Sequence, residues 1–415
     1  MTQSSTQSSP PDKLPIAFWI VVFIAFINAV GFTIIIPTLY PLAKQFQLSD
    51  FQASLLTTAY AGSQFIATPI LGRLSDRIGR KPLLVISLLG TCASNLLASL
   101  TPIAWPLFLA RILDGLTGGN TSIAQAVISD VTNPQQRAKA FGIFSGVFRL
   151  GFVLGPAISY FAQLLPTLPG VSSLGMSFIV SATMAFIAAI LTLIILPETH
   201  QQTEPFKLEL KDFGFFKVLQ ASRHPKLGKI FTSTFLVGST FTIFTFAFQP
   251  FFLNVLKQDA KALAIVFAAL GILGFIAQVK LLEPLRKKFS LVKVLGVSIL
   301  LRGIIFLLIP SLPNLVAFGI MMIPFGIINA FPMPIIDTLL SLKVDEQHQG
   351  EALGINSSYL SISNALGPAI GGLLVSLGYF VPFWITGVLT LLTAVFAYGI
   401  QESTEELSTP ESLTR

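Results

Sequence analysis

Long apolar runs dominate this sequence of 415 residues and decide what it can fold into. A helix crosses roughly 30 Å of hydrocarbon with about 20 apolar residues. With 53% hydrophobic and only 11% charged residues, the chain could not cover a soluble domain of this size with polar groups. We therefore predict an all-α integral membrane protein with twelve transmembrane helices. The twelve expected helices lie at 16–43, 51–71, 82–101, 103–129, 138–163, 174–197, 229–255, 261–282, 291–310, 314–341, 351–377 and 381–400.

One segment within these runs occurs twice. The sequences AFGI at 140–143 and LGPAI at 154–158 return as ALGI at 352–355 and LGPAI at 366–370, displaced by 212 residues. The duplication predicts two pseudo-symmetric six-helix bundles. Chains of this kind place a binding site where their halves meet and expose it alternately at the two membrane faces, so this organisation indicates transport. The expected parts are a disordered tail at 1–15, bundles at 16–197 and 229–400, a cytoplasmic linker at 198–228 and a tail at 401–415.

The basic residues predict the orientation. If the N-terminus is cytoplasmic, 20 of the 26 Lys and Arg residues fall on the cytoplasmic face, where basic residues are retained during insertion. The net charge of +7 then follows from topology, and we expect no nucleic-acid partner. The sequence has one cysteine, no nucleotide-binding loop and no metal-spaced His/Cys set, so we expect no cofactor, no metal and an ion gradient as the energy source.

A charged, glycine-containing stretch, GRLSDRIGRKP at 72–82, follows the second expected helix. Glycines allow a tight turn at the membrane surface, and a carboxylate among several cations can pair with arginine. We expect Asp130, at the cytoplasmic end of the fourth expected helix, to join this cluster. The predicted gating residues are Gly72, Asp76, Arg77, Gly79, Arg80 and Asp130.

The stretch at 72–82 resembles the signature between the second and third helices of the major facilitator superfamily. The glycine pattern of the fifth expected helix looks like the motif shared by the drug/proton antiporters of that superfamily, and 111–137 resembles the fourth helix of the tetracycline/proton exporters. This resemblance implies a major facilitator fold, small-molecule and proton partners, and a monomer in a bacterial-type inner membrane. The antiporter motif consists of Gly142, Gly151, Gly155 and Pro156.

Two departures bear on the mechanism. Where the tetracycline exporters carry an aspartate in the first helix, this chain has Asn28, and their acidic residue in the ninth helix has no counterpart near Leu300. Instead, a polar stripe follows the fourth expected helix within an arc of roughly 80°, and such a stripe must face protein or water. The stripe contains Arg111, Asp114, Gly118, Thr121 and Gln125.

A charge partner for Asp114 is expected from depth in the membrane. Counting about 1.5 Å per residue places Asp114 and Arg149 at similar depth, so we predict that they pair. This pair either fixes two helices together or takes part in proton coupling, and the predicted coupling residues are Asp114, Arg149 and Arg111. Arg302 has no obvious partner in the sequence.

The expected substrate cavity is lined by polar and aromatic residues of several helices. These observations predict a secondary active transporter, not an enzyme, that exports small amphipathic or drug-like compounds by proton-coupled alternating access. The alternatives are a proton-coupled importer or a flippase for a lipid-linked molecule of the same fold, or a non-transporting membrane receptor. The candidate cavity residues are Asn28, Tyr60, Gln64, Thr121, Gln125, Phe248, Gln249 and Asn329.

Overall fold

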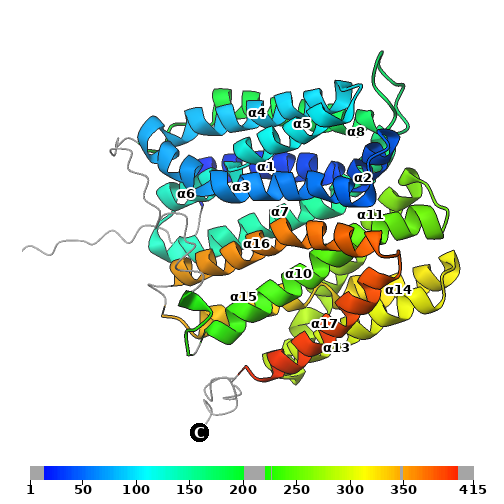
Figure 1. Cartoon of the computed structure of the whole chain (residues 1–415). Helices are drawn as coiled ribbons and strands as arrows, with labels where there is room; N and C mark the ends of the chain where they lie inside the picture. The colour runs from blue at the N-terminus through cyan, green and yellow to red at the C-terminus, as the bar shows by residue number, and fades with distance from the viewer. Residues whose placement is uncertain (1–13, 201–219, 226, 346–348, 401–415) are drawn as a thin grey trace, which may run out of the picture.

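The computed structural model describes residues 14–200, 220–225, 227–345 and 349–400, and these residues form helices and connecting turns without a strand (Figure 1). Residues 1–13 of the first expected tail, the whole second tail and most of the expected linker lie outside the described residues. The first half contains α1 (Ile16–Ile34), α2 (Ile36–Gln45), α3 (Asp50–Ile78), α4 (Arg80–Leu100), α5 (Ala104–Thr117), α6 (Asn120–Val131), α7 (Pro134–Ala162) and α8 (Gly175–Ile195). The second half contains α10 (Gly228–Pro250), the π-helix η2 (Phe251–Val255), α11 (Ala260–Lys280), α12 (Leu282–Lys288), α13 (Leu291–Leu308), the 3₁₀ turn η3 (Ile309–Ser311), α14 (Leu315–Ile328), α15 (Pro332–Leu342), α16 (Gln349–Ser376) and α17 (Val381–Tyr398).

Ten of the described helical segments are long and apolar enough to span a membrane. The two remaining expected spans are also helical but differ in character. The helix α3 has 29 residues and many polar side chains, whereas the fourth expected span is divided into the short helices α5 and α6. The all-α membrane fold is therefore confirmed, and ten of its twelve expected spans meet the criterion of length and apolarity.

Three expected helices are interrupted, which is a correction to the sequence interpretation. The first breaks at Ile35, just before Pro37, and the fourth breaks at the pair Gly118–Gly119. The tenth breaks at 329–331, immediately before Pro332. Proline lacks the N–H that a helix interior needs, and glycine is a poor helix former, so each break occurs where helical hydrogen bonding is weakest. Broken helices are tolerated in a membrane where they are buried in protein or line a cavity.

The stretch expected as a loop at 72–82 is mostly helical. The helix α3 continues to Ile78, and α4 begins at Arg80, so only Gly79 lies between them. Gly79 has φ of 105°, a conformation that favours glycine because it has no Cβ. This end of the bundle, where α3 meets α4, is called the motif end below. The opposite end carries α2 and the start of α11, and is called the Tyr40 end.

The duplicated segment produces equivalent helix contacts in the two halves. In the first half α7 packs on α1, and the Thr33 hydroxyl donates to the Gly151 carbonyl oxygen at 2.7 Å. In the second half α16 packs on α10, and the Thr242 hydroxyl donates to the Ser363 carbonyl oxygen at 3.0 Å. Residue 363 is 212 positions after Gly151, which is the displacement of the sequence repeat. The two halves are therefore related in packing as well as in sequence.

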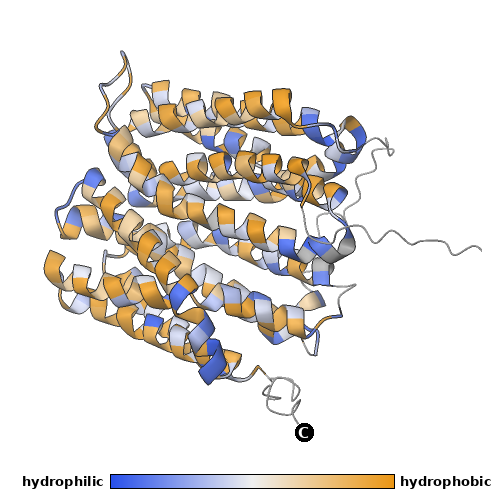
Figure 2. Ribbon diagram, turned by 180° about the vertical axis from the view of Figure 1, so that it is seen from behind, coloured by the Kyte–Doolittle hydropathy of each residue, from blue (hydrophilic) through white to orange (hydrophobic). Residues whose placement is uncertain are grey.

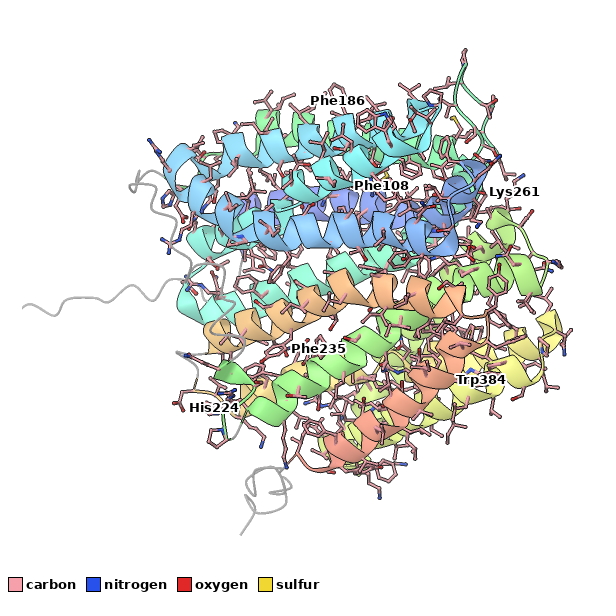
Figure 3. The ribbon with its side chains drawn as sticks, viewed as in Figure 1. Phe108, Phe186, His224, Phe235, Lys261 and Trp384 are labelled. Atoms are coloured by element: carbon pink, nitrogen blue, oxygen red, sulfur yellow. The ribbon has the colours of Figure 1, made fainter. Side chains whose placement is uncertain are left out.

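The ribbon coloured by hydropathy is mostly hydrophobic along the described helices (Figure 2). Large hydrophobic residues such as Trp105, Ile194 and Val395 are more than half exposed on these helices. In water this surface would be strongly unfavourable, but in hydrocarbon it is the expected exterior. His224 lies toward the motif end and Lys261 at the Tyr40 end, so polar groups mark both ends of the apolar band (Figure 3).

The halves are joined at the Tyr40 end. The Tyr40 ring packs edge-on against Phe246 with ring centres 5.8 Å apart, and Asn254 donates to the Tyr40 hydroxyl at 3.2 Å. A Cβ on Gly372 of α16 would collide with Ser54 of α3, so these helices approach closely between the halves. The described contacts therefore close the Tyr40 end of the interface between the halves.

Candidate functional site

A cavity of about 260 Å³ lies between the two halves. Its wall comes from α2 and α7 of the first half and from α10, α11 and α14 of the second. Most of the wall is apolar, and polar groups come from Thr245, Gln278 and Asn329. An apolar cavity with a few polar groups is the usual form of a small-molecule site. Its aromatic residues are Phe152, Phe241, Phe244, Phe248, Phe267, Phe275 and Phe325.

Phe248 and Asn329 are the two expected cavity residues that this wall contains. Gln249, the neighbour of Phe248, is 7% exposed, and its side-chain nitrogen donates to the Thr245 carbonyl oxygen at 3.1 Å. It does not line this cavity. Gln278 was not among the expected residues, because one glutamine in a long apolar helix carries no pattern that separates a cavity position from a helix contact.

Asn329 is held by a buried cation. The Arg302 guanidinium donates to the Asn329 side-chain oxygen at 3.3 Å, to the Thr240 hydroxyl at 2.7 Å and to the Val237 carbonyl oxygen at 3.2 Å. Arg302 is 1% exposed, and its Nε has no hydrogen-bond partner among the described residues. The break between α14 and α15 places Asn329 beside this group.

The first half contains a buried ion pair at another position. Arg111 and Asp114, one turn apart on α5, approach to 2.9 Å and are 2% and 3% exposed. The Arg111 guanidinium also donates to the Asn95 side-chain oxygen at 3.0 Å. The rings of Tyr60 and Phe178 each have their centre 5.7 Å from the guanidinium carbon, so the cation is enclosed by neutral groups and one carboxylate.

The described structure gives Asp114 an ion-pair partner on its own helix. The structure pairs Asp114 with Arg111, whereas the sequence interpretation chose Arg149. Arg149 belongs to α7, which packs against α1 and α11, while α5 packs against α3 and α4. The Arg149 side chain lies outside the described ones, so its own contacts stay a prediction. Estimated depth alone cannot identify a partner because it ignores which helices are neighbours.

The hydrogen bond from Gln64 supports the break in the fourth expected helix. Its side-chain nitrogen donates to the Gly118 carbonyl oxygen at 2.9 Å and lies 3.1 Å from the Tyr60 hydroxyl. A backbone carbonyl freed by a helix break needs such a partner when water is excluded. Tyr60 and Gln64 thus connect the ion pair to the break, rather than lining the cavity between the halves. Gln125, beyond the break, is exposed.

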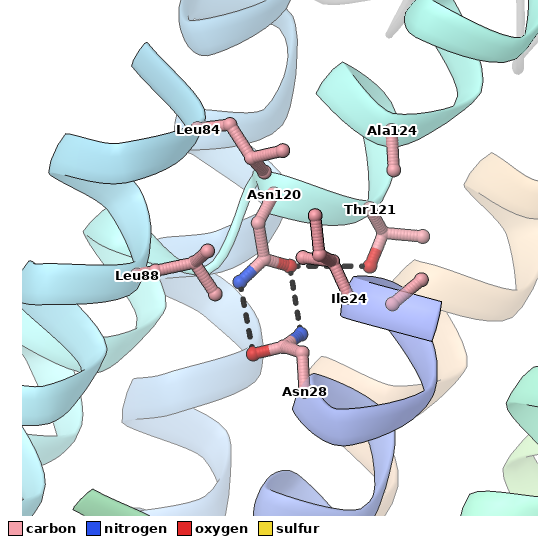
Figure 4. A pocket seen from close by; sticks show the side chains of 8 residues that line it. Ile24, Asn28, Leu84, Leu88, Asn120, Thr121 and Ala124 are labelled. Atoms are coloured by element: carbon pink, nitrogen blue, oxygen red, sulfur yellow. Dashed lines mark hydrogen bonds between the residues drawn. The ribbon is translucent and has the colours of Figure 1, made fainter. Parts of the chain in front are cut away.

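Asn28 has a reciprocal amide partner, Asn120, on α6 (Figure 4). The Asn28 side chain donates to Asn120 at 3.0 Å, and the Asn120 side chain donates back at 3.2 Å. Thr121 adds a hydrogen bond of 3.4 Å to Asn120. The adjoining space is only about 10 Å³, about one water molecule, so this site joins α1 to α6 and does not hold a drug-sized compound.

Charged residues form a compact cluster at the motif end. Arg80, 7% exposed, pairs with Asp76 and approaches Asp130 to 3.1 Å. It thereby connects the end of α3 and the start of α4 to α6. The structure brings these three expected gating residues together. By contrast, Arg77 is exposed to solvent, and a Cβ on Gly72 would contact no other atom within 4 Å.

Glu198 completes this cluster and was not predicted. Its carboxylate accepts hydrogen bonds from the backbone N–H groups of Arg80 and Lys81 at 2.9 and 3.1 Å. These N–H groups belong to the first turn of α4, where a carboxylate is favoured by the helix dipole and by unpaired donors. A Cβ on Gly79 would lie 2.6 Å from the same carboxylate. In the sequence, Glu198 is only the first acidic residue of the linker, and nothing local indicates its role.

Two of the three antiporter-motif glycines lie against α1. A Cβ on Gly151 would come within 2.7 Å of Ala29, and one on Gly155 would collide with Thr33. A Cβ on Gly142 would meet nothing within 4 Å. Small residues allow helices in a membrane to approach closely, so Gly151 and Gly155 set the distance between α7 and α1. Pro156 of the same motif lines the cavity between the halves.

A cluster of polar side chains around Tyr40 and Asp50 closes the Tyr40 end. Asp50 accepts a hydrogen bond from the Tyr40 hydroxyl at 2.7 Å and pairs with Lys44 at 2.9 Å. Burial and the nearby Asp50 carboxylate raise the pKa of Tyr379, so this phenol stays protonated and able to donate to Asp50. Together with Asn254, these residues connect the first half to the second. The sequence interpretation did not assign a role to Tyr40 or Asp50.

Comparisons with known proteins agree with this architecture. The family model described as "Major Facilitator Superfamily" matches residues 21–288 and 230–414. The tetracycline resistance protein, class C, of Escherichia coli is 29% identical over 352 residues, covering 83% of this chain and 86% of that protein. Multidrug resistance protein 1 of Bacillus subtilis (strain 168) is 29% identical over 381 residues, covering 91% and 94%.

Solved structures show the same fold at lower sequence identity. A bacterial homologue of the human lysosomal transporter Spinster, in an inward-facing and unoccupied conformation, has a TM-score of 0.74 at 17% identity and covers 92% of this chain and 95% of its own. A D-xylose-proton symporter has a TM-score of 0.70 at 16% identity and covers 94% and 99%. At these identities, the likeness concerns the fold alone.

Proposed function

The chain belongs to the Major Facilitator Superfamily and is a membrane transporter of small molecules, not an enzyme, and we propose that it is a proton-coupled exporter of amphipathic, drug-like compounds. The observation that carries this proposal is the aromatic cavity between the halves, together with the buried carboxylate of Asp114, to which we assign the exchange of a proton. The similar resistance proteins of Escherichia coli and Bacillus subtilis support export as the direction.

The ion pair Arg111–Asp114 is the proposed coupling element. A buried carboxylate paired with an arginine has two states, paired and ionised or protonated and released, and protons and substrate can both bias such an equilibrium. The pair lies directly before the break at Gly118–Gly119, which Gln64 supports from α3. A change in the pair can thus alter α5 relative to α3 and α6, elements that carry the cluster at the motif end.

The proposed orientation places both termini and the motif end in the cytoplasm of a bacterial-type inner membrane. The distribution of basic residues supports it, since cytoplasmic segments retain Lys and Arg. The contacts of Tyr40 and Asp50 then close the outer side of the transporter. The contacts at the Tyr40 end would have to break before the substrate is released to the outside. The cluster around Arg80 would then regulate opening of the transporter on the cytoplasmic side.

Transport in everted membrane vesicles tests both direction and coupling. A proton-coupled exporter accumulates its substrate in everted vesicles when the lumen is acidified, and dissipating the pH gradient with a protonophore removes the accumulation. A chemically diverse panel of fluorescent aromatic compounds serves as the probe. Accumulation in right-side-out vesicles instead would indicate an importer, and transfer of a labelled lipid-linked compound between leaflets would indicate a flippase. Substrate binding without movement in either vesicle type would indicate a receptor.

A further inference from the structure

The buried cation of Arg302 takes no part in the proposed coupling element. Its guanidinium donates only to neutral groups, and none of the described carboxylates forms an ion pair with it. Phe306 adds a ring whose centre is 5.8 Å from the guanidinium carbon. A buried charge without an opposite charge is costly, and such residues in membrane proteins usually serve a binding or conduction pathway.

The orientation of the Asn329 amide follows from this cation. A guanidinium has only N–H donors, so the Asn329 atom that faces Arg302 must be the amide oxygen. The Asn329 amide nitrogen is then directed away from Arg302, and the described structure gives it no hydrogen-bond partner. Because Asn329 lies in the cavity wall, it can present an N–H donor to a compound inside. The donor is polarised by the cation behind it.

No acidic residue is present among the described residues of the cavity wall. The buried carboxylate of the first half, Asp114, is neutralised by Arg111. In the second half, Asp337 accepts a hydrogen bond from the Asn356 side chain at 3.0 Å and belongs to α15, which lies beyond the break from Asn329. The cavity therefore combines aromatic walls, a donor at Asn329 and an uncompensated cation next to it.

We propose that this cavity selects aromatic organic anions, with Asn329 as the donor to the carboxylate or sulfonate group and Arg302 as the positioning residue and source of positive potential. The inference rests on the proposed role of the cavity as the substrate site. It adds the sign of the substrate charge, which the aromatic wall alone leaves open.

Equilibrium binding to the purified full-length protein measures this preference directly. Radiolabelled naphthoate is the anionic probe, and unlabelled naphthoate methyl ester and naphthylmethylammonium compete as neutral and cationic compounds of similar size. A single positive charge near a bound anion in a protein interior changes its affinity by about tenfold or more. We expect naphthoate to bind at least about tenfold more tightly than the ester or the ammonium compound.

Four variants separate charge from packing. Arg302→Gln should reduce the preference for naphthoate to less than about threefold. Arg302→Lys, measured at a pH low enough to keep the buried lysine protonated, should retain the preference because the positive charge is kept. Asn329→Asp gives Arg302 a carboxylate partner and should weaken naphthoate binding at least about tenfold, with little change for the ester. The control is Ser298→Ala, since the Ser298 hydroxyl donates only to carbonyl oxygens of its own helix.

Each result decides the proposal. Equal binding of the three compounds by the wild-type protein, binding of none of them, or an unchanged preference in Arg302→Gln would overturn it. If Arg302→Gln does not fold, Asn329→Asp still decides, because retained anion preference in that variant contradicts the assignment. Proton-driven export of the ammonium compound without any anion preference leaves the proposed function intact and rejects this inference. Selective naphthoate binding without proton-driven transport of any compound rejects the proposed function instead.

Discussion

Removing one member of the ion pair Arg111–Asp114 should destabilise the protein more than removing both. The two charges are 2.9 Å apart and nearly inaccessible, so each depends on the other for compensation. Breaking a buried pair costs about 3–5 kcal/mol, whereas replacing the whole pair by apolar residues of similar volume is often neutral or stabilising by about 1–4 kcal/mol. We therefore expect Asp114→Leu and Arg111→Met each to lower the free energy of unfolding by about 3–5 kcal/mol.

The double variant should recover most of this loss. Arg111 keeps only neutral contacts after Asp114→Leu, namely its hydrogen bond to Asn95 and the two nearby rings, and these do not replace a carboxylate. The free energy of unfolding in detergent micelles, from denaturant titrations of both single variants and the double variant, gives the coupling energy. We expect a coupling of several kcal/mol.

Arg149 provides the matched comparison. The same cycle with Arg149→Met and Asp114→Leu should be additive within about 0.5 kcal/mol if the two side chains do not interact. Additivity of Arg111 with Asp114, combined with strong coupling of Arg149 to Asp114, would refute the reasoning from the described pair. It would instead support the partner that was expected from depth in the membrane.

Three further changes test other parts of the molecule. Asp76→Asn should leave substrate binding within a few-fold but abolish most transport, because it breaks the cluster at the motif end, whose residues do not line the cavity; normal transport rates would contradict this. Gly155→Leu should reduce folded protein strongly in fluorescence-detected size-exclusion profiles, since α7 contacts α1 there, while Gly142→Leu should not; equal losses would reject the assigned contact. Asn254→Leu removes a hydrogen bond to Tyr40 between the halves and should increase labelling of cysteines introduced at the outer side of the cavity; unchanged labelling would show that this contact does not hold the outer side closed.

The positions of the helices were predictable because membrane thickness sets their length. A run such as 174–197 must form a helix in hydrocarbon whatever its neighbours are, and the structure has α8 at Gly175–Ile195. The breaks were less predictable. Gly118–Gly119 and Pro332 are visible in the sequence, but whether such residues kink, break or merely weaken a helix depends on what supports the freed backbone groups. At Gly118 this support comes from Gln64, which is 54 residues away.

Several polar residues of the site were predictable individually, but their partners were not. Asp114, Asn28 and Asp76 stand out in the sequence because polar side chains in or beside membrane helices are energetically costly unless they are paired or functional. Their partners follow from helix packing, which the spacing along one helix does not reveal. Asn28 meets Asn120 only because α6 approaches α1, and Asn329 meets Arg302 only because the break before α15 places it there. By contrast, the pairing of Arg111 with Asp114 was available from their spacing of one turn.

The central claim is that export is driven by protons through Asp114. Proteoliposomes containing wild-type protein or Asp114→Asn, loaded with a transported aromatic compound, allow accumulation against a pH gradient and exchange at equal pH to be measured in the same preparation. Asparagine keeps the shape of the side chain but cannot exchange a proton. We predict that Asp114→Asn loses gradient-driven accumulation while exchange at equal pH continues. Undiminished accumulation by Asp114→Asn would contradict the account and leave the pair with Arg111 a structural element only.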